Sequence, residues 1–87
     1  MEQQTTATIV VYTSGPQCVD CNIVKSWLQE RGYTYAERNI RTEPEALAQL
    51  QQLGYSSVPV TVIDDHVIDG LDLAALQAAV DQIELTR

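Results

Sequence analysis

Two cysteines about one helical turn apart are the chemically distinctive feature of this sequence. Cys18-Val19-Asp20-Cys21 follows a β-branched segment and a loop, and it opens a stretch with helical periodicity. At a helix N-terminus the unpaired amides and the helix dipole favour negative charge, so Cys18 should form a thiolate more readily than a free thiol. A free cysteine, with a reference pKa of about 8.5, is only about 3% ionised at pH 7. Cys21 lies within disulfide reach of Cys18, so the pair indicates thiol–disulfide exchange.

This chemistry gives the two sulfurs different roles. Cys18 is the expected nucleophile, which attacks a substrate disulfide and forms a mixed disulfide. Cys21 is the expected resolving residue, which attacks Cys18 and releases reduced substrate. Three other interpretations compete. A zinc site usually needs four ligands, and His66 is the one other candidate. A structural disulfide closing so short a loop would constrain little of the unfolded chain. The two cysteines could also be small buried apolar residues, but the junction of a loop and a helix is an unusual place for such residues.

Length and composition restrict the class of protein. The chain has 87 residues, 45% of them apolar, which fits one small globular domain. Twelve acids against five bases give a net charge of −7, which argues against nucleic acid or an anionic membrane as partner. There is no membrane span and no signal-peptide pattern at the start. We therefore expect a cytoplasmic monomer, with a frayed N-terminus at residues 1–6 and a single domain at residues 7–87.

The residue pattern predicts alternating strands and helices. Strands are predicted at 7–13, 33–40, 59–63 and 67–68, and helices at 18–31, 42–53 and 73–83. Thr42 and Glu45 have the spacing of a capping box, and Asp72 is the expected N-cap of the last helix. Asp64-Asp65-His66 is typical of a polar hairpin turn. The order βαβαββα predicts an α/β fold in which the βαβ start forces parallel strands and the late hairpin adds antiparallel pairing.

Three segments, in their order and spacing, resemble the glutaredoxin family of the thioredoxin-like superfamily. They are Val10-Val11-Tyr12-Thr13 leading to the cysteine pair, Gly54-Tyr55-Ser56-Ser57-Val58-Pro59-Val60, and Ile68-Asp69-Gly70-Leu71-Asp72-Leu73-Ala74-Ala75-Leu76. The resemblance covers about Ala7 to Glu84. The stretch from Thr42 to Val60 is most similar to the small redoxins that donate electrons to ribonucleotide reductase. The family implies a glutaredoxin-type, thioredoxin-like fold with a four-stranded mixed sheet flanked by three helices.

The resemblance also implies substrate-binding residues. A cis peptide bond at Val58-Pro59 would face the cysteines, and the backbone of Val58 would pair with substrate as an added strand. Gly70, Leu71 and Asp72 match the segment that binds the γ-glutamyl end of glutathione. Helix amides would meet its carboxylate, and Asp72 would meet its amine. Glutathione is thus an expected co-substrate, and no tightly bound cofactor or metal is expected.

The segment before the cysteines departs from the family pattern. Glutaredoxins usually carry a lysine there, whereas Ser14-Gly15-Pro16-Gln17, which we call the redox loop, contains no base. The residue before the second cysteine is often aromatic in the family and is Asp20 here. An acid in the first helical turn stabilises the helix but disfavours a nearby thiolate, and Lys25 is about 10 Å along the helix from Cys18. We expect Cys18 to be less acidic than in a basic-loop glutaredoxin.

Four further side chains have a structural and a functional interpretation. Arg38 and Arg41 are the nearest candidates for a glutathione carboxylate, but solvated surface charge is the favoured interpretation. His66 fits a solvated turn residue, and Trp27 falls on the apolar stripe of the first helix and fits the core.

Three functions remain open. The first is a dithiol oxidoreductase that reduces protein disulfides or glutathione mixed disulfides in cell redox homeostasis. The second is a dedicated electron-transport redoxin, for example for ribonucleotide reductase, which takes electrons from thioredoxin reductase instead of glutathione. The third is a dimeric binding module bridged by a metal or an iron–sulfur cluster, which would need further thiolates from a partner or from glutathione.

Overall fold

The computed structural model describes residues 8–85, so the frayed N-terminus expected at residues 1–6 lies outside the described residues. The elements follow the predicted order βαβαββα. They are β1 (Ile9–Thr13), α1 (Val19–Glu30), β2 (Ala36–Asn39), α2 (Pro44–Gln52), β3 (Val60–Ile63), β4 (His66–Asp69) and α3 (Leu73–Leu85). No helix between residues 8 and 85 has the length and apolar character to cross a membrane.

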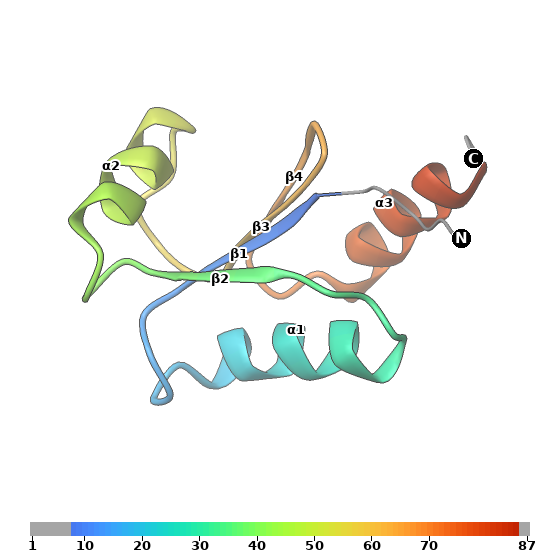
Figure 1. The fold of residues 1–87 in the computed structure, drawn as a ribbon, viewed down its shortest axis with the longest axis horizontal. Coiled ribbons are helices and arrows are strands. Elements are labelled where there is room, and N and C mark those ends of the chain that lie inside the picture. The colour runs from blue at the N-terminus through green and yellow to red at the C-terminus, as the bar shows by residue number, and fades with distance from the viewer. Residues whose placement is uncertain (1–7, 86–87) are drawn as a thin grey trace.

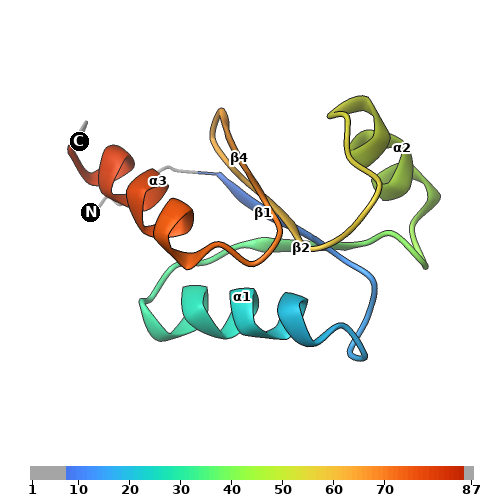
Figure 2. The same cartoon turned by 180° about the vertical axis from the view of Figure 1, so that it is seen from behind.

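The strands form one mixed sheet in the order β2-β1-β3-β4, which confirms the predicted fold class. β1 pairs in parallel with β2, and the pairs β1–β3 and β3–β4 are antiparallel. In Figure 1, α1 lies below the sheet and α2 lies above it; Figure 2 gives the view from behind. α1 and α3 contribute to one buried cluster on the sheet, and α2 contributes to a second cluster.

Residues 9–12 of β1 are apolar, as expected for a strand whose two faces are both covered by helices. Ile9 and Val11 belong to the cluster with α1 and α3, whereas Tyr12 belongs to the cluster with α2. The Tyr12 hydroxyl donates a hydrogen bond to Gln49 Oε1 at 3.2 Å. Tyr12 is therefore a packing residue of the sheet.

The sheet register brings three candidate segments to one end of the fold. Tyr12 pairs with Val60, and Val60 pairs with Asp69. The chain therefore leaves β1 into the redox loop at the same end where it enters β3 from Pro59. It leaves β4 into Gly70 at that end as well.

The predicted capping box at Thr42 and Glu45 is wrong. The N-cap of α2 is Glu43, and its side chain makes no cap hydrogen bond. The Glu43 carboxylate instead accepts a hydrogen bond from Arg38 Nε at 2.7 Å. Pro44 follows in the first turn of α2, where a missing amide proton costs no helical hydrogen bond.

The predicted strands at 33–40 and 67–68 differ most from the structure. β2 starts at Ala36, and the Tyr33 amide donates to the Leu28 carbonyl in the turn that closes α1 after Glu30. His66, predicted in the turn, is the first residue of β4 and pairs with Ile63. Asp64, with a φ of 54°, makes the left-handed step that closes this tighter hairpin.

Candidate redox site

Cys18 and Cys21 are joined by a disulfide, with their Cα atoms 5.2 Å apart. Cys18 is the N-cap of α1, and its sulfur accepts a hydrogen bond from the Cys21 amide at 3.2 Å. Cys18 is half-buried, whereas Cys21 is 0% exposed. The pair thus has one sulfur-bearing residue at the surface and one behind it, as an attacking and a resolving residue require.

The redox loop is fastened to the first turn of α1. Asn22 Nδ2 donates to the Pro16 carbonyl at 2.9 Å, and Gln17 Nε2 donates to the Ser14 carbonyl at 2.6 Å. Gly15 has a φ of +113°, and a Cβ there would lie 2.7 Å from Gln17 Oε1. A side chain at Gly15 would therefore strain the loop that places Cys18.

A trio of polar side chains, Thr13, Lys25 and Glu37, lies next to this loop. The buried Thr13 hydroxyl donates to Glu37 Oε2 at 2.7 Å, and Lys25 Nζ lies 3.2 Å from the same oxygen. The Thr13 hydrogen bond is the main cause that lowers the pKa of Glu37, and Lys25 acts in the same direction against the opposing effect of desolvation. Sequence analysis missed this trio because the pairing joins α1 to β2, and no local pattern encodes it.

The acidity of Cys18 can be tested through its neighbour Asp20. In the reduced protein we expect the helix N-terminus and the Cys21 amide to favour the Cys18 thiolate and Asp20 in the first turn to oppose it, while Lys25 is engaged by Glu37. We expect the Asp20→Asn variant to ionise Cys18 at lower pH than the wild type. The measurement is thiolate absorbance at 240 nm of the reduced protein against pH. The exposed Asp81 on α3 gives the matched control Asp81→Asn, and equal midpoints for all three proteins would contradict the expectation.

The substrate-binding residues that the resemblance implies lie at the end of the sheet where β1 leads into the redox loop. The Val58-Pro59 peptide bond is cis, as expected, with Val58 half-buried and Pro59 buried. The Gly70 amide donates to the Pro59 carbonyl at 2.8 Å, which ties these two segments together. Asp72 Oδ1 accepts from the Ala75 amide at 3.0 Å, so Asp72 caps α3 as predicted.

Exposed apolar side chains lie at the start of α1 and of α3. Val19, directly after Cys18, is 67% exposed, and Leu71 and Leu73 before and at the start of α3 are also exposed. A hollow of about 380 Å³ runs along α1 from this point, and its lining consists of Val19, Asn22, Ile23, Ser26, Trp27, Glu30 and Leu73. The cysteine pair is therefore flanked by an apolar surface.

Two of the three remaining candidates, Arg38 and Trp27, have structural partners. Arg38 is paired with Glu43, whereas Arg41 is exposed in the turn before α2. Trp27 is buried in the core, as expected, and the Arg31 guanidinium lies 4.3 Å from its ring centre. Within residues 8–85 there is no group of three or more His, Cys, Asp or Glu side chains suited to a metal ion.

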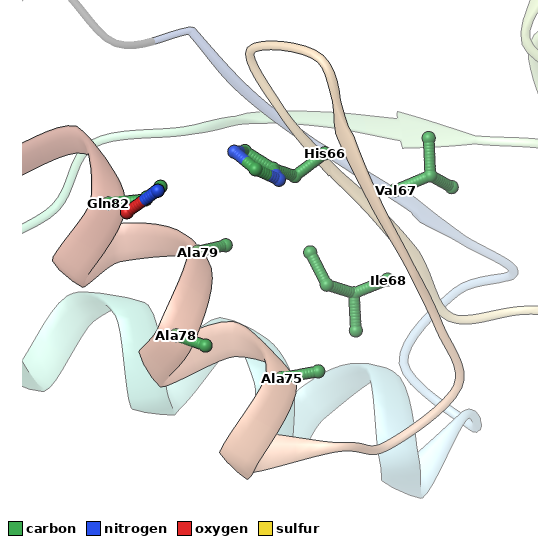
Figure 3. A pocket seen from close by; sticks show the side chains of 7 residues that line it. All are labelled: His66, Val67, Ile68, Ala75, Ala78, Ala79 and Gln82. Carbon is green, nitrogen blue, oxygen red and sulfur yellow. The ribbon is translucent and has the colours of Figure 1, made fainter.

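A second hollow lies away from the cysteines, between β4 and α3. It measures about 480 Å³ and is lined by His66, Val67, Ile68, Ala75, Ala78, Ala79 and Gln82 (Figure 3). His66 also lies 3.7 Å from Asp65 and is exposed. The lining of this second hollow includes three alanine side chains and no cysteine, so the hollow is not part of the redox site.

Known proteins share this sequence pattern and fold. The glutaredoxin family model matches residues 9–68. Glutaredoxin-like protein NrdH of Lactococcus lactis is 32% identical over 62 residues, which cover 71% of this chain and 85% of the relative. The thioredoxin-like protein BC3987 superposes with a TM-score of 0.78 at 33% identity, over 83% of this chain and 99% of that one. The glutaredoxin-like NrdH-redoxin from Escherichia coli, described as having a thioredoxin-like activity profile, gives a TM-score of 0.74 at 27% identity, over 82% and 92%.

Proposed function

Since this chain belongs to the glutaredoxin family and is a thiol–disulfide oxidoreductase, we propose that it is a dithiol redoxin that reduces disulfides of partner proteins. The observation that carries the proposal is the asymmetry of the cysteine pair. Cys18 is half-buried at the N-cap of α1 and bonded to Cys21, which is fully buried. A buried thiol cannot reach a large substrate, but it can attack a neighbouring sulfur.

Two exchanges of sulfur partners complete the proposed reaction. The Cys18 thiolate attacks one sulfur of the substrate disulfide, forms a mixed disulfide and expels the other substrate sulfur as a thiolate. The Cys21 thiolate then attacks the Cys18 sulfur, forms the Cys18–Cys21 bond and expels the second substrate thiolate. Two electrons pass from the redoxin to the substrate, and the two protons released by the cysteines balance those taken up by the substrate thiolates.

The segments beside the cysteines are suited to hold a peptide. We assign the backbone of Val58 to strand-like pairing with the substrate, and the cis bond at Pro59 to its presentation. Gly70, Leu71 and Asp72 form the other side of this proposed groove, because the hydrogen bond from the Gly70 amide to the Pro59 carbonyl holds the two segments side by side. The exposed side chain of Leu71 offers apolar contact to the substrate.

The charges near the cysteines favour a protein substrate over glutathione. Asp20, Asp69 and Asp72 are exposed at this end of the fold. Lys25 and Arg38 are paired with acids, and the exposed Arg41 is outnumbered by these three acids. Glutathione carries two carboxylates and one amine, so an acidic surface disfavours it. The apolar surface around Val19 fits a side chain of a protein substrate instead.

A second candidate concerns the source of electrons. Similarity to NrdH proteins and the base-free redox loop favour an electron carrier reduced by a flavoprotein such as thioredoxin reductase. We propose ribonucleotide reductase as one acceptor of such a carrier. We retain a cytoplasmic location, a monomeric state and the absence of a tightly bound cofactor as predictions. Colour after anaerobic purification would favour the alternative of a cluster-bridged dimer.

The two electron donors can be compared directly. NADPH oxidation is measured with a protein disulfide as acceptor and with either thioredoxin reductase or glutathione plus glutathione reductase as donor. We expect the flavoprotein arm to be at least about tenfold faster, which corresponds to about 1.4 kcal/mol of transition-state stabilisation. The Gln17→Lys variant, which adds a base to the redox loop, should raise the glutathione-driven rate. Faster turnover of the wild type with glutathione would contradict this candidate.

A further inference from the structure

Glu37 is an acidic side chain on β2 whose carboxylate reaches two other elements. It lies beside Val11 in the parallel pairing, and Val11 packs on the sheet face that α1 covers. Its carboxylate accepts from the Thr13 hydroxyl at 2.7 Å and from Lys25 Nζ at 3.2 and 3.3 Å. Three elements, β1, β2 and α1, thus meet at one carboxylate.

In the sequence, one partner of Glu37 precedes the cysteine pair and the other follows it. Thr13 is the last residue of β1, directly before the redox loop, and its carbonyl accepts from the Ile40 amide at 2.8 Å. Lys25 is on α1, one helical turn beyond Cys21 and on the same side of the helix. The hydrogen bonds from Thr13 and from Lys25 to the Glu37 carboxylate therefore link the two ends of the segment that contains the redox loop and Cys18.

We propose that Glu37 is a positioning residue for disulfide exchange, because it clamps the end of β1 to α1 and so holds Cys21 in reach of Cys18 after the disulfide opens. This inference rests on the proposed dithiol function. In the oxidised protein the Cys18–Cys21 bond itself restrains the loop and the helix. In the mixed-disulfide state that restraint is gone, and the clamp, which is already formed in the oxidised protein, is the restraint that remains. The rate of the resolving attack depends on how closely the two sulfurs are held together.

The two steps of exchange can be separated with 5,5′-dithiobis(2-nitrobenzoate), added as one equivalent to the reduced protein. Cys18 attacks the reagent disulfide and releases one thionitrobenzoate, leaving the second bound to Cys18 as a mixed disulfide. Cys21 then attacks Cys18, closes the protein disulfide and releases the second thionitrobenzoate. We expect Glu37→Gln to slow the second release about tenfold and to change the first by less than about twofold. A merely structural role for Glu37 would not change the ratio of the two rates in a folded protein.

Three further variants complete the test. Thr13→Val keeps the shape of the side chain but removes the donor, and Lys25→Met removes the charge from a side chain that is partly exposed. Each should slow the second release as Glu37→Gln does, and the Thr13→Val/Glu37→Gln double variant should be no slower than about the slower single variant, because one clamp is lost. Glu43→Gln, which breaks the Arg38 pair at α2, is the matched control and should leave both rates unchanged. If Glu37→Gln does not fold, Lys25→Met decides the outcome.

Failure of this inference is distinguishable from failure of the proposed function. If the wild-type protein releases only one thionitrobenzoate, the dithiol function itself is wrong. If the wild type releases two, and the Glu37, Thr13 and Lys25 variants keep the wild-type ratio of rates, the positioning role is wrong. A second release slowed equally by Glu43→Gln would also overturn it.

Discussion

Replacement of Cys18 by serine is expected to reduce turnover of a protein disulfide by at least about a thousandfold. A serine hydroxyl is not ionised near neutral pH and does not attack sulfur, and Cys21 is too deeply buried to replace it. Turnover is measured as NADPH oxidation in the coupled assay with the faster of the two donors. Unfolding of the variant by heat is measured in parallel, so that loss of structure is not mistaken for loss of chemistry. Turnover within about tenfold of the wild type would contradict the assignment of Cys18 as the nucleophile.

Replacement of Cys21 by serine is expected to leave the first attack intact and to stop the second. The mixed disulfide on Cys18 should accumulate because the neighbouring thiol that resolves it is absent. Steady-state turnover with a protein disulfide should fall about a hundredfold, since attack by an external thiol lacks the advantage of a thiol held in place.

The control for Cys21→Ser is the rate of its first step. Reaction of the reduced variant with 5,5′-dithiobis(2-nitrobenzoate) should release the first thionitrobenzoate about as fast as the wild type does. A variant that retains most of its turnover would show that Cys21 is not needed for release. The dithiol proposal would then be wrong, and a reaction that uses only Cys18 would replace it.

The element order was predictable because each element carries a local signal. The β-branched run at 9–11 and the helical spacing after Cys18 are readable without the rest of the chain. Asp72 was identified as a cap for the same reason, and it makes the expected hydrogen bond to Ala75. Local chemistry decides these features, so sequence patterns predict them well.

Features decided by contacts between elements were not predictable. Thr42 has the correct spacing for a cap, but the Glu43 carboxylate and Arg38 form an ion pair across the turn, and the N-cap is Glu43 instead. The Glu37 trio likewise depends on the register of β2 beside β1, which single-sequence patterns do not specify.

The candidate site was predicted in two ways with different physical bases. Helix position and spacing alone singled out Cys18 and Cys21. The cis bond at Val58-Pro59 came from the family resemblance, because local sequence leaves the trans form of an X-Pro bond favoured by about 0.5–1 kcal/mol. The hydrogen bond from the Gly70 amide to the Pro59 carbonyl joins the ends of two strands, so it could not be predicted without the folded structure.

The division of labour between the two sulfurs is the claim on which the account depends. Its most direct test is the intact mass of reduced Cys18→Ser and Cys21→Ser after each is mixed with the same protein disulfide. The account predicts that Cys21→Ser carries the covalently bound substrate and that Cys18→Ser remains unmodified. Substrate bound to Cys18→Ser, or bound equally to both variants, would contradict it.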